Sequence, residues 1–418
     1  MPEDPDGPTV AARPGAHVDA RGSEASSPAL PAADLKSTHL TSANLGARGL
    51  ESRGLESTGL RRAVLKWSGA LTAGALIVVP LWMLLGNPAV LGGHPALPTL
   101  LWTVAAAGLA WSFVLVKRFA LFERGSLNKE QSLNEHPLRR SSVSRWQLTR
   151  GLAGRFVVLG VVAALVWLNP FPYRPGGGPE FTPPAEPAAS AAPSASSRAT
   201  QSTPATENSV PAGSTPAVTT TEDATSITLA PEGAATTGLV FYPGAKVDAH
   251  AYQDLLRPLA AAGHLVVILK EPLGISLLDT GQARAAMDRH PEIAGWAVGG
   301  HSLGGVSASA FAAANHDVSG LLLFASYPAE NMTDAPGLSV LSISGSHDGL
   351  STPDKIAASR SLLPPATSYV TVAGGVHAFF GDYGEQPGDG QPAITREKAQ
   401  QQIVAESLHF MDRLKAAD

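Results

Sequence analysis

Hydrophobic positions divide the chain into segments of different character, and the longest are three apolar stretches in its first half. They lie at about 63–85, 97–116 and 152–171. A transmembrane helix needs about 20 predominantly apolar residues. Buried helices of soluble proteins rarely run so long without a polar face. The pattern therefore predicts a membrane region over residues 61–173 with three transmembrane helices.

Basic residues around these stretches predict their orientation. The loop over residues 86–96 carries no Lys or Arg, whereas many basic residues lie between 117 and 150. Because cytoplasmic loops are enriched in Lys and Arg, we expect the N-terminus and the basic loop inside and everything after Tyr173 outside. The expected localisation is the cell membrane, with several spans, the lipid bilayer as a partner and an extracytoplasmic C-terminal domain.

Residues 1–60 are polar and rich in Pro, Gly, Ser and Ala, so disorder is the default expectation. Leucine recurs every five residues from Leu30 to Leu65, which resembles the spacing of the pentapeptide-repeat family. Arg48 and Arg53 stand where that family has small residues, and the run is too short to stack many turns. We expect a low-complexity, mostly disordered arm with a weak pentapeptide period.

The second half of the chain combines a linker with a folded domain. Residues 174–225 are dominated by Pro, Ala, Ser, Thr and Gly, a composition typical of extended linkers. Over 226–418, short apolar runs alternate with helical patterns. Because these runs lack a polar face, they predict an α/β domain with a mostly parallel sheet and helices on both faces. The runs lie at 238–242, 264–269, 295–298, 321–324, 338–343 and 368–372.

Composition narrows the chemistry that this domain can perform. The net charge of -5 gives no reason to expect nucleic-acid binding. The chain has no cysteine, which excludes disulfides, zinc–thiolate sites and a cysteine nucleophile. The sequence implies neither a metal ion nor an organic cofactor, and it indicates no particular protein partner.

The stretch most informative about function is Gly300-His301-Ser302-Leu303-Gly304, which lies between an apolar run and a small-residue helical run. This G-x-S-x-G pattern between a strand and a helix is typical of a nucleophile elbow, whose sharp turn raises the serine hydroxyl above the sheet. The alternative is an ordinary turn rich in small residues. The later acid and histidine favour a catalytic role for Ser302.

A serine nucleophile needs a histidine base and an acid that orients the histidine. Asp348 follows the run at 338–343 and His377 follows the run at 368–372. Both therefore lie at carboxyl ends of predicted parallel strands, where open α/β sheets collect functional groups. His347 and Asp382 are neighbouring alternatives, which we interpret as a loop side chain and a supporting group.

The oxyanion formed by nucleophilic attack needs two N–H donors. One is expected to be the amide of Leu303, directly after the nucleophile. The other is expected from the loop after the first core strand, where Ala245 follows Pro243 and Gly244. An ordinary Pro-Gly turn would explain this loop equally well.

These motifs resemble the α/β-hydrolase superfamily and, within it, the bacterial, lidless, dienelactone-hydrolase-like group. The resemblance is carried by FYPGAKVDAHAY, GGHSLGG, GSHDGL and GGVHAFFGDYGEQPGD, and it covers residues 238 to about 414. It implies hydrolase chemistry through Ser302, Asp348 and His377. Few residues precede Gly238, so the sheet is expected to lack the first one or two strands of the family unless 226–229 supplies one.

The expected function is a membrane-anchored serine hydrolase, specifically a carboxylesterase that forms an acyl-enzyme on a small or envelope-borne ester. One alternative is an extracytoplasmic acyltransferase that passes the acyl group to an envelope glycan. Another is a non-catalytic, tethered binding module with a hydrolase fold. The spans carry almost no ionisable residues at mid-membrane, which argues against transport.

Overall fold

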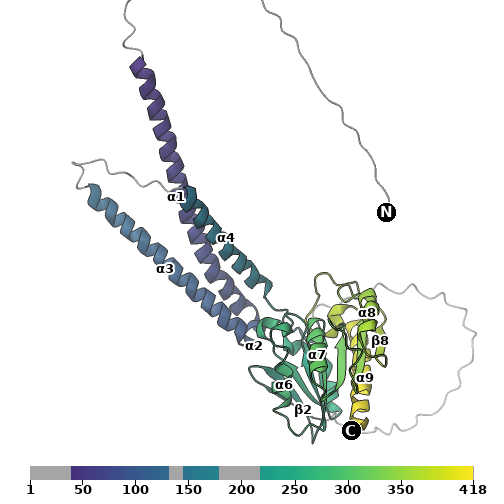
Figure 1. The fold of residues 1–418 in the computed structure, drawn as a ribbon. Coiled ribbons are helices and arrows are strands. Elements are labelled where there is room, and N and C mark those ends of the chain that lie inside the picture. The colour runs from purple at the N-terminus through teal and green to yellow at the C-terminus, as the bar shows by residue number, and fades with distance from the viewer. Residues whose placement is uncertain (1–38, 131–144, 178–216, 418) are drawn as a thin grey trace, which may run out of the picture. The chain divides into compact units, whose positions relative to one another are not determined.

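The computed structural model describes residues 39–130, 145–177 and 217–417. The chain divides into two compact units, Met1–Leu60 and Arg61–Asp418. The described part of the first unit is helical, because α1 runs from His39 to Gly86 (Figure 1). The sequence predicted a mostly disordered arm over residues 1–60, and the structure describes helix from His39 onward. Residues 39–60 have no proline, and an existing helix is extended at little cost. Residues 1–38 lie outside the described residues.

Three helical segments in the described ranges are long and apolar enough to cross a membrane. They are Ala63–Gly86 in α1, Ala96–Arg118 in α3 (Ala96–Glu130) and Trp146–Trp167 in α4 (Arg145–Trp167). The short helix α2 (Pro88–Gly92) joins the first two. The third apolar stretch was expected to continue to residue 171, but α4 ends at Trp167. Pro170 explains the earlier end, because the residue before a proline disfavours helical geometry.

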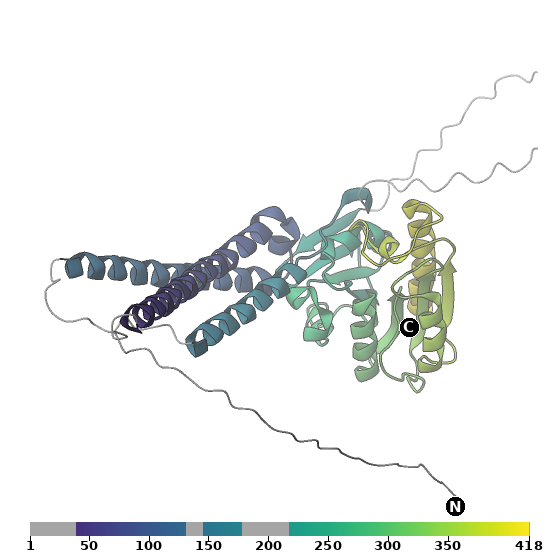
Figure 2. The same cartoon turned by 90° about the horizontal axis from the view of Figure 1, so that it is seen from above.

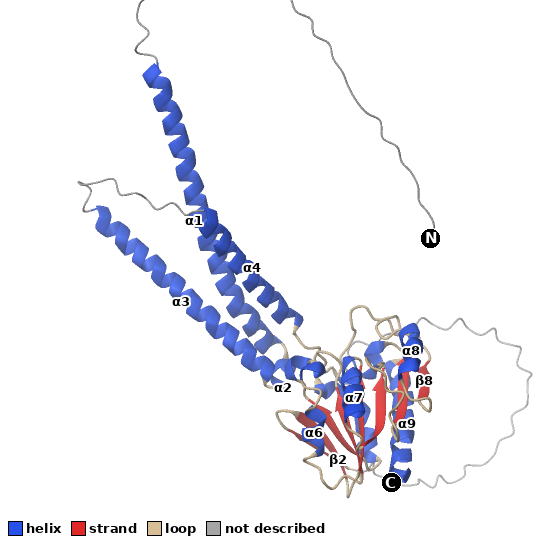
Figure 3. Ribbon diagram, in the orientation of Figure 1, coloured by secondary structure: helices blue, strands red, loops and turns tan. Residues whose placement is uncertain are grey.

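An eight-stranded sheet in the order β1-β2-β4-β3-β5-β6-β7-β8 organises the C-terminal domain (Figure 3). β1 pairs antiparallel with β2, and β2 pairs antiparallel with β4, whereas the remaining pairs are parallel. The bounds are β1 Val218–Glu222, β2 Ser226–Pro231, β3 Thr237–Tyr242, β4 Leu265–Leu269, β5 Gly295–His301, β6 Val318–Phe324, β7 Ser339–Gly345 and β8 Ser368–Val372.

The sheet begins earlier than the predicted domain start at residue 226. β1 lies inside the stretch assigned to the linker, and β1 with β2 supplies the strands that the domain was expected to lack. The sequence of β1, VTTTE, has no apolar run, and four of its five residues are exposed. Threonine nevertheless has a high β-propensity, so an exposed edge strand is compatible with it. The remaining linker residues 178–216 lie outside the described ranges.

Helices cover both faces of the sheet (Figure 2). Successive side chains of a strand point to opposite faces. In β3, Leu239 and Phe241 pack with α5 (Gln253–Ala261) and α9 (Arg396–Ala417), whereas Val240 and Tyr242 pack with α6 (Gln282–Met287) and α7 (Leu303–Ala314). The remaining helix, α8 (Pro353–Ser359), follows β7. This arrangement gathers the loops after the parallel strands at one edge of the sheet.

Candidate active site

Ser302 lies at the turn between β5 and α7, in a backbone conformation that few non-glycine residues adopt. Its φ is 52° and its ψ is -120°. Its N–H donates to the carbonyl of Phe324 over 3.0 Å, and its carbonyl accepts from the Ser326 hydroxyl over 2.6 Å. These bonds to the loop after β6 hold the strained turn. The Ser302 side chain does not cap α7, so its hydroxyl remains available for chemistry.

The glycines of the motif are required by close backbone contacts. A Cβ atom on Gly304 would lie 2.1 Å from the carbonyl oxygen of Tyr242 and 2.2 Å from that of Pro243. A Cβ atom on Gly300 would lie 2.4 Å from the carbonyl carbon of Gly304. The start of α7 therefore packs directly against the carboxyl end of β3, which brings the loop after β3 beside Ser302.

Asp348 and His377 come together as the sequence predicted. His377 Nδ1 lies 2.8 Å from Asp348 Oδ2, and both side chains are fully buried. The other carboxylate oxygen accepts the backbone N–H groups of Leu350 at 2.8 Å and Ser351 at 2.7 Å. These bonds fix the carboxylate so that it accepts the Nδ1 proton. His377 Nε2 is then left with its lone pair, and it is buried without a hydrogen-bond partner.

The histidine loop lies against the nucleophile turn. The rings of His301 and His377 have centroids 4.5 Å apart. In the described part of the chain, His377 Nε2 makes no hydrogen bond, to Ser302 or to any other group. Catalytic hydrogen bonds are often long or poorly aligned before substrate binds, and they tighten in the complex. Ser302 and the Asp348–His377 pair are thus neighbouring but not directly bonded.

A buried tyrosine connects the loop after β3 to the nucleophile turn. The Tyr252 hydroxyl accepts the N–H of Gly244 at 2.9 Å and lies 2.8 Å from His301 Nδ1. Burial, and then the nearby His377, lowers the pKa of His301 well below its ordinary value. His301 is therefore neutral, and its Nδ1 can accept the tyrosine proton. The sequence did not single out Tyr252 or His301 for this role.

The two predicted oxyanion donors are the backbone amides of Leu303 and Ala245. Leu303 is the first residue of α7, where backbone N–H groups have no partner one turn earlier. Ala245 follows Gly244, and its N–H donates to no backbone carbonyl among the loop bonds of the described residues. Because Gly304 packs on Pro243, the two amides belong to contacting segments.

Comparison with known proteins is consistent with this arrangement. Residues 238–402 match the sequence model of the Alpha/beta hydrolase family. The C-terminal domain has an α/β-hydrolase fold, and its sequence is similar to this family over these residues. A similar solved structure is that of a dienelactone hydrolase-like promiscuous phosphotriesterase from metagenomic libraries, at 19% identity and a TM-score of 0.35. That match covers 45% of this chain and 92% of the other. A comparison with curated proteins gives no match.

Asp389 connects the acid and histidine loops of the hydrolase domain, and the sequence did not reveal it. Its carboxylate accepts the N–H groups of His377 at 3.1 Å, Ala378 at 2.8 Å and Gly349 at 3.1 Å. Since Gly349 directly follows Asp348, one side chain holds both loops in register. Asp389 is one of three acidic residues in the GGVHAFFGDYGEQPGD stretch, and nothing in the sequence distinguishes it from Asp382 and Glu385.

The two alternatives named from the sequence lie elsewhere. The carboxylate of Asp382 accepts from the Gln400 side chain of α9 at 3.0 Å, so it does not support the ring of His377. His347 is exposed, and its Nδ1 lies 2.8 Å from the carbonyl oxygen of Gln391. Our interpretation of Asp382 as a supporting group is therefore wrong, whereas His347 is a loop side chain as expected.

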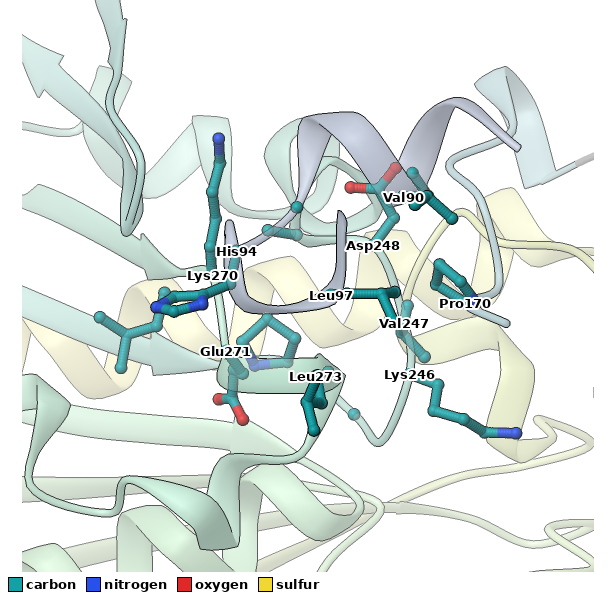
Figure 4. Close-up of a pocket in the computed structure, with 17 residues that line it drawn as sticks. Val90, His94, Leu97, Pro170, Lys246, Val247, Asp248, Lys270, Glu271 and Leu273 are labelled. Atoms are coloured by element: carbon teal, nitrogen blue, oxygen red, sulfur yellow. The ribbon is translucent and has the colours of Figure 1, made fainter. Parts of the chain in front are cut away.

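A small cavity of about 40 Å³ lies beside the loop after β3 (Figure 4). Its lining combines residues of the turn between α1 and α3 with residues that follow β3 and β4, mostly with apolar side chains. Its polar lining residues are His94, Lys246, Asp248, Lys270 and Glu271. Burial raises the pKa of Glu271 well above its ordinary value, and its Oε1 has no hydrogen-bond partner. Among the described residues, no group of three or more His, Cys, Asp or Glu side chains is suited to hold a metal ion.

Proposed function

We propose that this chain is a membrane-anchored serine hydrolase that cleaves carboxylic esters through Ser302, His377 and Asp348. The observation that carries the proposal is the state of His377. Its Nδ1 is bonded to a fixed carboxylate, and its Nε2 is buried without a partner. A buried nitrogen left unpaired is costly, and a catalytic role is one explanation for such a group. Similarity to the Alpha/beta hydrolase family supports hydrolysis in general, and the strained Ser302 supports a serine nucleophile.

The mechanism follows from these positions. Nε2 of His377 accepts the Ser302 proton while Oγ attacks the ester carbonyl carbon. The resulting oxyanion is bound by the amides of Leu303 and Ala245, and Asp348 stabilises the imidazolium. The C–O bond of the ester then breaks, and the alcohol leaves with the proton from His377. Water attacks the acyl-enzyme by the same steps and releases the carboxylic acid.

Three apolar helices support the membrane anchor, because each is long enough to cross a bilayer. The distribution of basic residues supports an extracytoplasmic hydrolase domain. No lid domain is inserted between Ser302 and Asp348, since only residues 325–338 separate β6 from β7. An open site of this kind suits small esters or esters presented on a surface.

A fluorophosphonate probe on the purified full chain in detergent tests the proposal. Wild type should be labelled, and Ser302→Ala should not. Ester hydrolysis should fall by about 10⁴-fold or more in Ser302→Ala, because the attacking group is lost. Asp348→Asn should also lose about 10⁴-fold, because the histidine tautomer is no longer fixed. Ser361→Ala, at an exposed serine, is the matched control. Equal labelling of wild type and Ser302→Ala would refute the proposal.

A further inference from the structure

The end of the third apolar helix is bonded to the loop that carries Ala245. Phe171 forms a parallel bridge with Val247. The Phe171 N–H donates to the carbonyl of Lys246 at 2.6 Å, and the Phe171 carbonyl accepts from Asp248 at 3.0 Å. The Lys246 ammonium group also donates to the carbonyl of Trp167, the last residue of α4, at 2.8 Å. The site edge of the hydrolase domain is therefore fixed to a helix end.

The ends of α1 and α3 meet the same edge. Leu273, in the loop after β4, packs against an apolar cluster built from helix residues. Val90 of α2 and Leu97 of α3 line the same cavity as Val247 and Leu273 of the hydrolase domain (Figure 4). The cluster consists of Met83, Leu84, Val90, Leu97, Leu101 and Leu165.

Two exposed leucines lie beside the edge of the hydrolase domain that meets the helix ends. Leu277 is 51% exposed and Leu278 is 57% exposed, and no other large apolar side chain in 217–417 is comparably open to solvent. Both belong to the short helix Ser276–Leu278. The neighbouring Ser276 hydroxyl donates to the carbonyl of Leu303 at 3.3 Å, so the leucines lie close to the start of α7.

The apolar helical region also has an exposed leucine near this edge of the hydrolase domain. Leu91 of α2 is 61% exposed. The segment Pro272–Gly274 contacts α3, and Leu277 and Leu278 follow it within a few residues. The two leucines therefore lie near the turn that joins the first two apolar helices.

We propose that Leu277, Leu278 and Leu91 contact the bilayer surface, and that Ser302 acts on an ester of a lipid held in that bilayer. This inference rests on the proposed function. A bilayer is the occupant that fits, because the edge carrying these leucines is bonded to the ends of helices long enough to cross a membrane. Exposed apolar patches on soluble domains mark such contacts.

The cavity beside the site is consistent with a substrate that remains partly in the lipid. Its volume of about 40 Å³ is room for a few water-sized groups and not for a long acyl chain. In the proposed arrangement the scissile ester reaches Ser302 at the membrane surface while its chain stays in the bilayer. Water cleaves the ester, and the products are a carboxylic acid and an alcohol.

The test compares two substrates with the same leaving group. Full-length protein in phosphatidylcholine vesicles is assayed on water-soluble p-nitrophenyl acetate and on p-nitrophenyl palmitate held in the vesicles. In L277S/L278S, hydrolysis of the palmitate should fall at least about tenfold, because the two apolar side chains that contact the lipid surface are lost. Hydrolysis of the acetate should stay within about twofold, and fluorophosphonate labelling should not change.

Two further variants control the result. L338S changes a half-buried leucine at the amino end of β7, on the opposite edge of the sheet, and should leave the ratio of the two rates unchanged. L277W/L278W should retain palmitate hydrolysis, since tryptophan also favours the membrane surface. An unchanged ratio in L277S/L278S overturns the inference. So does an equal fall on both substrates, which would show that the leucines only position α7.

Failure of the proposed function has a different signature. A wild-type protein that neither hydrolyses the acetate nor takes the fluorophosphonate label would refute the serine hydrolase itself. A wild type that hydrolyses the acetate and ignores the palmitate in vesicles would overturn only the lipid substrate.

Discussion

Glu271 is a buried carboxyl group that the proposed mechanism does not use. Burial is the main cause of its raised pKa, the bond to Ser276 opposes the shift, and the charge of Asp279 adds to it. Its Oε1 has no hydrogen-bond partner. The neutral acid is therefore the stable form in the folded protein, whereas an unfolded glutamate ionises above a pH of about 4.3.

This difference makes the stability of the fold depend on pH. As pH rises above about 4.3, the unfolded state loses the Glu271 proton first, so the free energy of unfolding falls until the folded group also ionises. Each unit of raised pKa removes about 1.4 kcal/mol. Glu271→Gln removes the titration, so it should raise the melting temperature more at about pH 8 than at about pH 5.

Thermal unfolding of the full chain in detergent measures this effect. Glu330→Gln, at an exposed glutamate, should show no comparable dependence on pH. If Glu271→Gln were less stable than wild type at the higher pH, the carboxylate and not the acid would be the stabilising form. Our account of Glu271 would then be wrong.

The site residues predicted from the sequence are those that lie in a recognisable local sequence pattern. Ser302 lies in a short motif, and Asp348 and His377 each follow an apolar strand. Tyr252 and Asp389 lie in no such pattern, because their roles come from contacts between segments that are distant in sequence. Tyr252 meets His301 across 49 positions of sequence, and Asp389 meets Gly349 across 40. Only the folded sheet edge brings these partners together.

At the scale of elements, the turn from β5 into α7 depends on the absence of a side chain at Gly304. The added Cβ would meet the carbonyl oxygens of Tyr242 and Pro243, which cannot rotate away as a side chain can. The start of α7 would have to move away from β3. That shift would displace both Ser302 and the amide of Leu303.

Gly304→Ala should therefore lower the rate of fluorophosphonate labelling by about 10²-fold or more, because a displacement of about 1 Å is that costly. The matched control is Gly281→Ala, where φ is -80° and the added Cβ meets only Asp279 Oδ1 at 3.7 Å. Similar labelling rates for both variants would show that the turn tolerates the shift.

The elements that the sequence predicted well are those with a strong apolar pattern. The central parallel strands are buried on both faces, so their runs of Val, Leu and Ile stand out. β1 has its side chains mostly in solvent, and its threonines resemble the linker composition around it. Residues 39–60 carry a leucine at every fifth position, a spacing that does not match the 3.6-residue turn of an α-helix. Their helix is continuous with the apolar segment of α1.

At the scale of the whole molecule, the distribution of basic residues predicts that the hydrolase domain lies outside the cell. Protease added to intact cells should therefore digest an epitope placed after Asp418. An epitope placed in the basic region between α3 and α4 should be digested only after lysis. The opposite pattern would reverse the orientation of all three spans.

Because Phe171 is bridged to Val247, the length of the stretch over residues 178–216 does not set the distance between α4 and the hydrolase domain. The chain docks on the hydrolase domain before this stretch begins, and it enters the sheet of the same domain at Val218 after the stretch ends. The stretch therefore connects two points of the same hydrolase domain. Lengthening such a connection costs little entropy, since each doubling adds only about 0.6 kcal/mol. Its length can therefore change in evolution without releasing the hydrolase domain from the end of α4.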